Sequence, residues 1–289
     1  MTVASLPPLT VWSVLTHWSV PGLVVIPWSF AVWAYLRGVR RVQARGGTWS
    51  RSRSLAFAAG AICVLVALAS GIDAYANVLF SVHVVQHLLL TFVAPPLLAL
   101  SAPVTLALRA IPRSDGRRLV RILHSRPVTL LTHPVVAWVA FVSVPFAIHF
   151  SSYYDLALHN TWVHASEHLL LFSTGLLFWW PIVGIDPAPR TLDHPARVLS
   201  LVMAMPAQSF LALAIYSAPR TLYPGYLAQL SRAGSSALAD QGMAAALMWV
   251  VGGALLLFAV LVSVVRWKRD EEHRARRSEQ RVATAYPRP

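Results

Sequence analysis

The stretch SVHVVQHLLLTFVAPPLLALSAP, residues 81–103, contains no Asp, Glu, Lys or Arg. An α-helix of this length would be about 34 Å long, which exceeds the ~30 Å hydrocarbon core of a bilayer. Runs of comparable length and apolarity recur along the chain. They predict seven membrane-spanning helices, at residues 19–38, 55–72, 78–108, 128–149, 160–183, 196–217 and 237–266. The predicted fold is therefore an all-α integral membrane protein, a bundle of seven transmembrane helices.

The composition agrees with a membrane protein. The chain has 289 residues, of which 56% are hydrophobic and 12% charged, whereas about 25% of residues in soluble domains are charged. A net charge of +13 would suit a nucleic-acid-binding protein. Here the arginines lie in short loops between the predicted spans, so we expect no nucleic-acid partner. The single cysteine, Cys63, leaves no thiolate metal motif. We predict a membrane domain at residues 1–267 and a charged cytoplasmic tail at residues 268–289, partly disordered.

The basic residues predict the direction of the chain. Of the 24 Lys and Arg residues, 22 fall in the first, third and fifth connecting loops or in the segment from Arg266 onward, and the second and fourth loops have none. Cytoplasmic loops of membrane proteins are enriched in Lys and Arg. These loops and the tail are therefore predicted to be cytoplasmic, and the N-terminus external. The third and fifth spans then both enter the membrane from outside.

A pair of histidines lies near the start of each of these two spans. His83 and His87 are four residues apart, as are His164 and His168, which puts each pair on one face of its helix. The fourth span runs outward and ends at His149, at a similar depth. Neutral imidazoles bind zinc, copper and iron, and ionisable residues inside membrane spans are rare and commonly functional. We predict that these histidines bind a metal or cofactor. The alternative is that they only form hydrogen bonds within the bundle or face interfacial water.

Other groups near the outer face are candidates to assist the histidines. Ligating imidazoles usually donate their second N–H to a carboxylate or carbonyl, and the candidates here are Asp73, Glu167 and Asp240. Glu167 is adjacent to His168 and thus points about 100° away from it, so we expect such a partner rather than a ligand of that pair. Met243, one turn after Asp240, could offer a thioether to a soft ion. The alternative for Asp73 and Asp240 is a loop or helix-start carboxylate in water, and for Met243 it is simple packing.

The remaining histidines are separate from this group. His17 and His159 are predicted to be external but at or beyond the ends of spans, which leaves their participation open. Those predicted on the cytoplasmic side cannot join the site: His124, His133, His194 and His273. Inside the third span, the consecutive residues Pro95 and Pro96 remove two backbone donors and predict a kink.

These motifs resemble one known family. The stretch at residues 81–103 contains an H-x-x-Q-H pair that runs into an apolar, proline-bearing segment. It resembles the signature of the CtaG family of bacterial cytochrome c oxidase assembly factors, which are associated with caa3-type oxidases. The similarity continues, in order, through HASEHLLLFSTGLLFWWPIVGIDP (164–187), YSAPRTLYPGY (216–226) and LADQGMAAALMWVVGG (238–253).

The resemblance implies a multi-pass protein of the bacterial plasma membrane that supplies or inserts copper as the oxidase matures. It implies oxidase subunits as partners and an extracytoplasmic copper donor. By position, the histidine pairs of the family correspond to His83 with His87 and to His164 with His168. Only the family selects copper, because imidazole-rich sites suit Cu(II), zinc and iron equally, while Cu(I) carriers usually recruit sulfur.

Three alternatives share the same pattern. A seven-span hydrolase with an H-x-x-x-H motif would use zinc to activate water, with Glu167, Asp240 or Asp73 as the base. A bis-His haem protein would take one imidazole from each helix. A structural scaffold for oxidase subunits would need no metal. The assembly factor, which is not expected to be an enzyme, is the favoured interpretation.

Overall fold

The computed structural model describes residues 10–18, 22–226 and 236–285, which contain helices, turns and irregular segments but no β-strand. The elements are α1 (Val11–Thr16), α2 (Gly22–Ala44), α3 (Arg51–Ala69), α4 (Gly71–Ala76), α5 (Phe80–Leu88), the π-helical turn η2 (Leu89–Val93), α6 (Ala94–Leu100), α7 (Pro103–Ala110), α8 (Arg113–Leu123), α9 (Arg126–Leu131), α10 (Pro134–His149), α11 (Tyr153–His159), α12 (Thr161–Val183), α13 (His194–Tyr216) and α15 (Ala237–Ala285).

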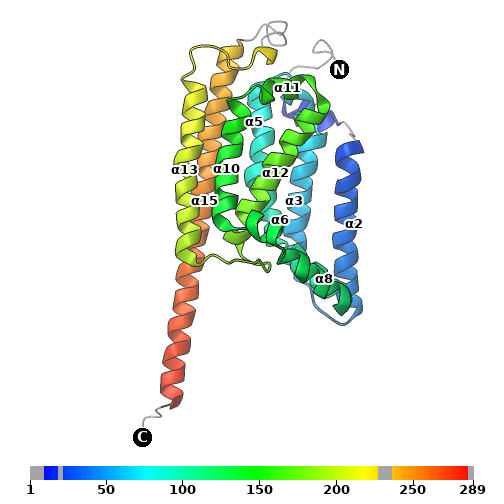
Figure 1. Cartoon of the computed structure of the whole chain (residues 1–289), viewed down its shortest axis with the longest axis vertical. Coiled ribbons are helices and arrows are strands. Elements are labelled where there is room, and N and C mark those ends of the chain that lie inside the picture. Colours follow the sequence, from blue (N-terminus) through cyan, green and yellow to red (C-terminus); the bar gives the residue numbers. More distant parts are fainter. Residues whose placement is uncertain (1–9, 19–21, 227–235, 286–289) are drawn as a thin grey trace.

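The long helices stand side by side in a bundle (Figure 1). Among the described residues, five helical segments are long and apolar enough to cross a membrane, namely α2, α3, the run from α5 to α7, α13 and α15. The helices α10 and α11 make a sixth if they count as one span with a bend of 68°. The prediction of an all-helical fold with several apolar helices long enough to span a membrane is confirmed for the described residues.

The seventh predicted span corresponds to α12. Its 23 residues would extend for about 34 Å, which is long enough to cross a bilayer. Its mean hydropathy is too low for it to count among these candidate spans, because its first turns carry His164, Glu167 and His168. The count of seven spans and the external N-terminus therefore stay predictions.

A π-helical turn accommodates the prolines of the third span. Pro95 has no N–H, so the carbonyl oxygen of Thr91, four residues earlier, loses its helical donor. The turn η2 directly precedes Ala94 and Pro95, and the indole N–H of Trp179 on α12 donates to the Thr91 oxygen at 2.9 Å. The irregularity predicted from the prolines is thus a widened turn that joins the third span to α12.

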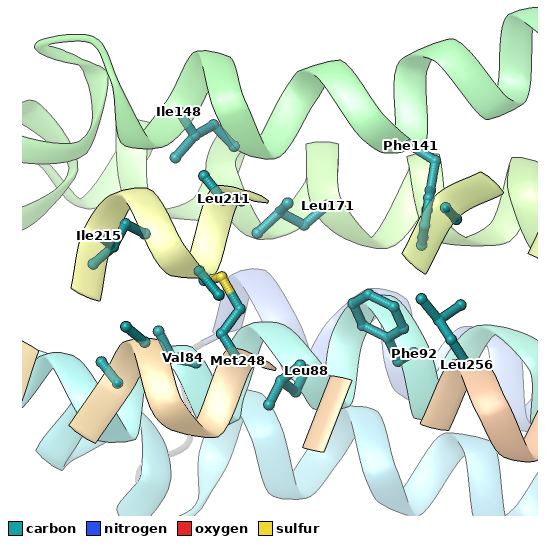
Figure 2. Packing of buried hydrophobic residues seen from close by; sticks show 14 of the residues in the cluster. Val84, Leu88, Phe92, Phe141, Ile148, Leu171, Leu211, Ile215, Met248 and Leu256 are labelled. Atoms are coloured by element: carbon teal, nitrogen blue, oxygen red, sulfur yellow. The ribbon is translucent and has the colours of Figure 1, made fainter. Parts of the chain in front are cut away.

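The main apolar core lies between α5, α10, α12, α13 and α15 (Figure 2). Val84 and Leu88 on α5 pack there with residues from the other four helices, such as Leu171, Leu211 and Met248. On α5 these core residues directly follow His83 and His87 in the sequence. Packing of the core therefore fixes the helix that carries the first histidine pair.

The basic segments lie at one end of the bundle. The arginine-rich helix α8 and the loop from α12 to α13 are at the end from which α15 extends, whereas α11 is at the opposite end (Figure 1). The helix α15 continues as far as Ala285 and projects well beyond the bundle. Residues 286–289 lie outside the described part of the chain, so a partly disordered tail stays a prediction.

Candidate metal centre

The first histidine pair lies on α5, and a side chain from α15 holds the start of that helix. The first N–H groups of a helix have no partner within it. At α5, the carboxylate of Asp240 accepts from the N–H of Phe80 at 2.7 Å and from the hydroxyl of Ser81. The sequence predicts Asp240 as a partner of a ligating imidazole, and its hydrogen bonds in the structure are to the start of α5. Asp240 caps the helix and so places His83 and His87.

The second pair lies on α12, whose start is capped by the residue directly before the helix. The side-chain oxygen of Asn160 accepts from two backbone N–H groups of the first turn. The ring centroids of His164 and His168 are 4.2 Å apart, as are those of His83 and His87. Each pair therefore occupies one helix face, as the four-residue spacing predicts.

The two pairs meet inside the bundle. The ring centroid of His83 lies 5.4 Å from that of His164 and 6.1 Å from that of His168. Nitrogens of His83, His87 and His168 lie within 4.8 Å of one another, and the same limit holds for ligand atoms of His83, His164 and Glu167. We call His83, His87, His164, Glu167 and His168 the imidazole–carboxylate cluster.

Glu167 lies between the two pairs. Its Oε1 is 3.5 Å from Nε2 of His83 and 3.4 Å from Nε2 of His87, and its side chain is completely buried. Its adjacency to His168 predicts a residue that points away from the ligands. It is also three residues after His164, however, and residues with this spacing are neighbours on a helix face. Glu167 is therefore a candidate ligand itself.

The cluster contains buried polar atoms that have no hydrogen-bond partner. Within the described residues they include Nε2 of all four histidines and both carboxylate oxygens of Glu167. Native proteins rarely leave such atoms unpaired, because each one costs about 1–3 kcal/mol. A metal ion would satisfy the imidazole lone pairs and the carboxylate together. The donors present fit a metal.

A tyrosine determines which nitrogen of His83 carries the proton. The hydroxyl of Tyr226 donates to the carbonyl oxygen of Ala76 at 2.8 Å and lies 3.3 Å from Nδ1 of His83. Its single hydrogen is used by Ala76, so it accepts from Nδ1 of His83. The lone pair of His83 is then on Nε2, the atom that faces Glu167. Hydrogen bonds of this kind orient ligating histidines in metal sites.

His149 lies at the edge of the cluster. Its ring centroid is 6.2 Å from that of His87, and its Nδ1 is 2.9 Å from the hydroxyl of Tyr223. It is outside the two groups of ligand atoms that lie within 4.8 Å. Tyr154 packs against both His149 and His83, with ring centroids 5.3 and 5.1 Å away. His149 thus reaches the level of the pairs, as predicted, but in an adjoining layer.

Tyr223 and Tyr226 lie in the segment after α13, and two polar side chains hold this segment. The side-chain oxygen of Gln241 accepts from the backbone N–H directly before Tyr223 at 2.8 Å. The carboxylate of Asp155 accepts from the N–H directly before Tyr226 at 3.2 Å. The sequence alone does not single out these tyrosines. The one signal is their position in YSAPRTLYPGY, one of the stretches that resemble the family.

The other predicted site residues near this end of the bundle have different surroundings. Asp73 accepts from the side-chain nitrogen of Gln86 at 3.0 Å and so holds the glutamine of the H-x-x-Q-H motif. Met243 is 57% exposed, so its side chain lies on the outside of the bundle. His159 is exposed, and Nδ1 of His17 lies 3.0 Å from a carbonyl oxygen of α1.

The histidines predicted on the cytoplasmic side are outside the cluster. Two of them have charged partners: Nε2 of His133 lies 2.8 Å from Arg190, and that of His194 lies 3.0 Å from Asp270. The other two are exposed.

An apolar cavity of about 560 Å³ reaches the cluster from the side of α2. Residues of α2, α3 and α12 line it, among them Phe57 and Phe172, and its polar groups include Asp73, His164 and His168. Small-molecule pockets usually have volumes of about 300–1,000 Å³. An apolar molecule could therefore approach these two imidazoles laterally.

A helical, multi-pass bundle that encloses four imidazoles and a carboxylate defines a membrane protein with a candidate metal site. Residues 33–270 match the family described as cytochrome c oxidase caa3 assembly factor (Caa3_CtaG). The chain belongs to this family, as its motifs predict.

Relatives occur in mycobacteria. Uncharacterized proteins of Mycobacterium bovis and Mycobacterium tuberculosis are each 31% identical over 287 residues, which cover 96% of this chain and 43% of the relative. An uncharacterized protein of Mycobacterium leprae is 28% identical over 300 residues, which cover 96% of this chain and 46% of the relative. The chain thus spans less than half the length of these relatives. No solved structure matches the chain significantly.

Proposed function

We propose that the chain binds a metal ion, preferably copper, in the imidazole–carboxylate cluster and helps to supply it to cytochrome c oxidase. The family gives the process, which is oxidase assembly. The observation that carries metal binding is the convergence of four unpaired imidazole nitrogens and an unpaired carboxylate in a buried position. Caps on α5 and α12 hold these donors in place before an ion arrives.

We place the cluster in the outer leaflet of the bacterial plasma membrane, with α12 as the seventh span. The arginine-rich segments lie at the end of the bundle opposite α11, and Lys and Arg favour the cytoplasmic side. A copper donor outside the cell membrane and the copper-binding subunits of the oxidase could then reach the cluster from the same side.

The donor set also bears on how an ion would be held. One group contains His83, His87 and His168, and the other contains His83, His164 and Glu167. Because His83 belongs to both, an ion can shift between the groups and keep one ligand throughout. Imidazole and carboxylate donors suit Cu(II) and Zn(II), and the charge of Glu167 would partly balance that of the ion in an interior of low dielectric.

A zinc hydrolase is the second candidate, and the cavity beside α2 favours it. Such an enzyme needs an open metal position, a carboxylate base and access for its substrate. Glu167 lies among the imidazoles, and the cavity reaches His164 and His168. Hydrolysis of lipid substrates by the zinc-loaded protein would support this function, and copper bound without hydrolysis would support the assembly factor.

The test of copper supply uses oxidase activity in cells. Replacement of His87 or His168 by Ala should lower oxidase activity under copper limitation, while the oxidase polypeptide still accumulates at first because only its cofactor is missing. Added copper should partly restore activity. His273→Ala, on the exposed part of α15, is the matched control and should behave as the wild type. Full activity of the His87 and His168 variants at wild-type protein levels would contradict metal delivery and leave the scaffold.

A further inference from the structure

A second, much smaller cavity lies beside His87 and His149. Its volume is about 30 Å³, enough for roughly one water molecule or ion. Its polar and sulfur-containing lining residues come from five different elements: His87, Thr91, His149, Gln208 and Met248. Because the space is so small, these residues would all face the same occupant.

The lining of this cavity is not that of an ordinary apolar core. The hydroxyl oxygen of Thr91 is buried without a partner among the described residues. His87 and His149 are only 7% and 5% exposed, and Nδ1 of His149 is already engaged by Tyr223. The other nitrogen of His149 therefore stays available as a donor. A polar occupant is needed to satisfy these groups.

Met248 adds a sulfur to this lining. It is 5% exposed, and Figure 2 shows its side chain pointing from α15 into the core. Met243, on the same helix, is 57% exposed. Five residues turn an α-helix by about 140° relative to the starting direction, which explains why one thioether points inward and the other outward. The sulfur that could serve a metal is therefore that of Met248.

We propose that His87, His149 and Met248 form an inner metal position that takes a soft ion such as Cu(I). The inference rests on the proposed function of the imidazole–carboxylate cluster, and it deepens that function by adding a sulfur donor. Thioether ligands select Cu(I), whereas imidazole and carboxylate donors also suit Cu(II) and Zn(II). His87 is shared by the cluster and the inner position, so the two positions adjoin through one ligand.

The test uses the full chain, purified in detergent and loaded with Cu(I) under anaerobic, reducing conditions. X-ray absorption at the copper edge should show a sulfur neighbour in the wild type and in Met243→Leu, and none in Met248→Leu. Leu has nearly the volume of Met, so the core stays filled. Competition with a Cu(I) chelator should show that Met248→Leu loses Cu(I) affinity by about tenfold or more. Residues that only support a ligand usually cost ~10–100-fold, and loss of a ligand should cost at least as much. Zn(II) affinity should not change.

Two outcomes would overturn the inference, and they are distinguishable. Copper bound by nitrogen and oxygen only, with equal Cu(I) affinity in the wild type and Met248→Leu, would remove the inner position and leave the cluster intact. Absence of Cu(I), Cu(II) and Zn(II) binding in the folded wild type would remove the proposed function itself. A second variant, His149→Gln, guards against a packing effect at position 248. It should lower Cu(I) affinity and leave the thermal unfolding midpoint of the metal-free protein near that of the wild type.

Discussion

The hydroxyl oxygen of Tyr226 lies 3.3 Å from Nδ1 of His83, and its own hydrogen is donated to the carbonyl oxygen of Ala76. A residue of the segment after α13 thereby holds His83 with its lone pair on Nε2. Supporting hydrogen bonds of this type commonly change metal affinity by about 10–100-fold when they are removed.

Tyr226→Phe should therefore lower the metal affinity of the cluster by about 10–100-fold. It should also destabilise the protein by about 1–3 kcal/mol, because the carbonyl of Ala76 loses its donor. Isothermal titration with Cu(II) or Zn(II) measures the first effect. Tyr216→Phe is the control, since Tyr216 is 62% exposed. Equal affinity of the two variants would show that Tyr226 does not orient His83.

Replacement of Glu167 should have opposite effects on the two forms of the protein. Without metal, its buried carboxylate oxygens have no hydrogen-bond partner, and unsatisfied buried polar groups are destabilising. Glu167→Gln should thus raise the thermal unfolding midpoint of the metal-free protein. Addition of metal should raise the unfolding midpoint of this variant by less than it raises that of the wild type, because a charged ligand is lost. A lower unfolding midpoint in the metal-free variant than in the metal-free wild type, together with unchanged metal affinity, would make Glu167 a structural residue.

The bond from Trp179 to the Thr91 carbonyl should contribute to stability. Pro95 deprives this carbonyl of its helical donor, and the indole N–H replaces it at 2.9 Å. Trp179→Phe should destabilise the protein by about 1–3 kcal/mol, the usual penalty for an unpaired buried acceptor. Trp249→Phe is the control, because Trp249 is 53% exposed. Unfolding in detergent, followed by circular dichroism, should show a clear difference between the two variants.

The direction of the chain in the membrane can be tested with reporter fusions. Fusions after residues 45, 118 and 275 should be cytoplasmic, and those after residues 75 and 155 should be external, because the basic loops are expected inside. The fusion after residue 155 is decisive, since it reports the side on which α11 and the cluster lie. A cytoplasmic result there would place the histidines in the inner leaflet and remove external copper supply.

The sequence predicts the position of most long helices because long apolar runs determine them. The predicted spans at 160–183 and 196–217 differ by no more than two residues from α12 (Thr161–Val183) and α13 (His194–Tyr216). The i,i+4 spacing likewise predicts each histidine pair, because it depends only on helix geometry. The break of the third span into separate helices is only partly foreseen, since the prolines indicate an irregularity and not its form.

Contacts between distant parts of the chain are not predictable in this way. Asp240 caps a helix that begins 160 residues earlier, and Tyr226 reaches His83 across 143 residues. Glu167 lies among the candidate ligands because of the position of α5, whereas its adjacency to His168 suggests the opposite. Met243 and Met248 also cannot be distinguished until the packing of α15 shows which face is buried. The site is therefore visible in the sequence as a set of donors, and its supporting residues come from the fold.

The central claim is that His83, His87, His164 and His168 together bind a metal ion, and the metal content of the purified protein tests it most directly. Elemental analysis after expression with copper and zinc should find stoichiometric metal in the wild type and in the control with His124 and His273 replaced by Ala. The variant with all four cluster histidines replaced by Ala, checked for its helical circular dichroism spectrum, should contain almost none. A visible spectrum of the wild type without a Soret band would show that these imidazoles do not bind haem. Equal metal content in the folded four-residue variant and the wild type would contradict the account.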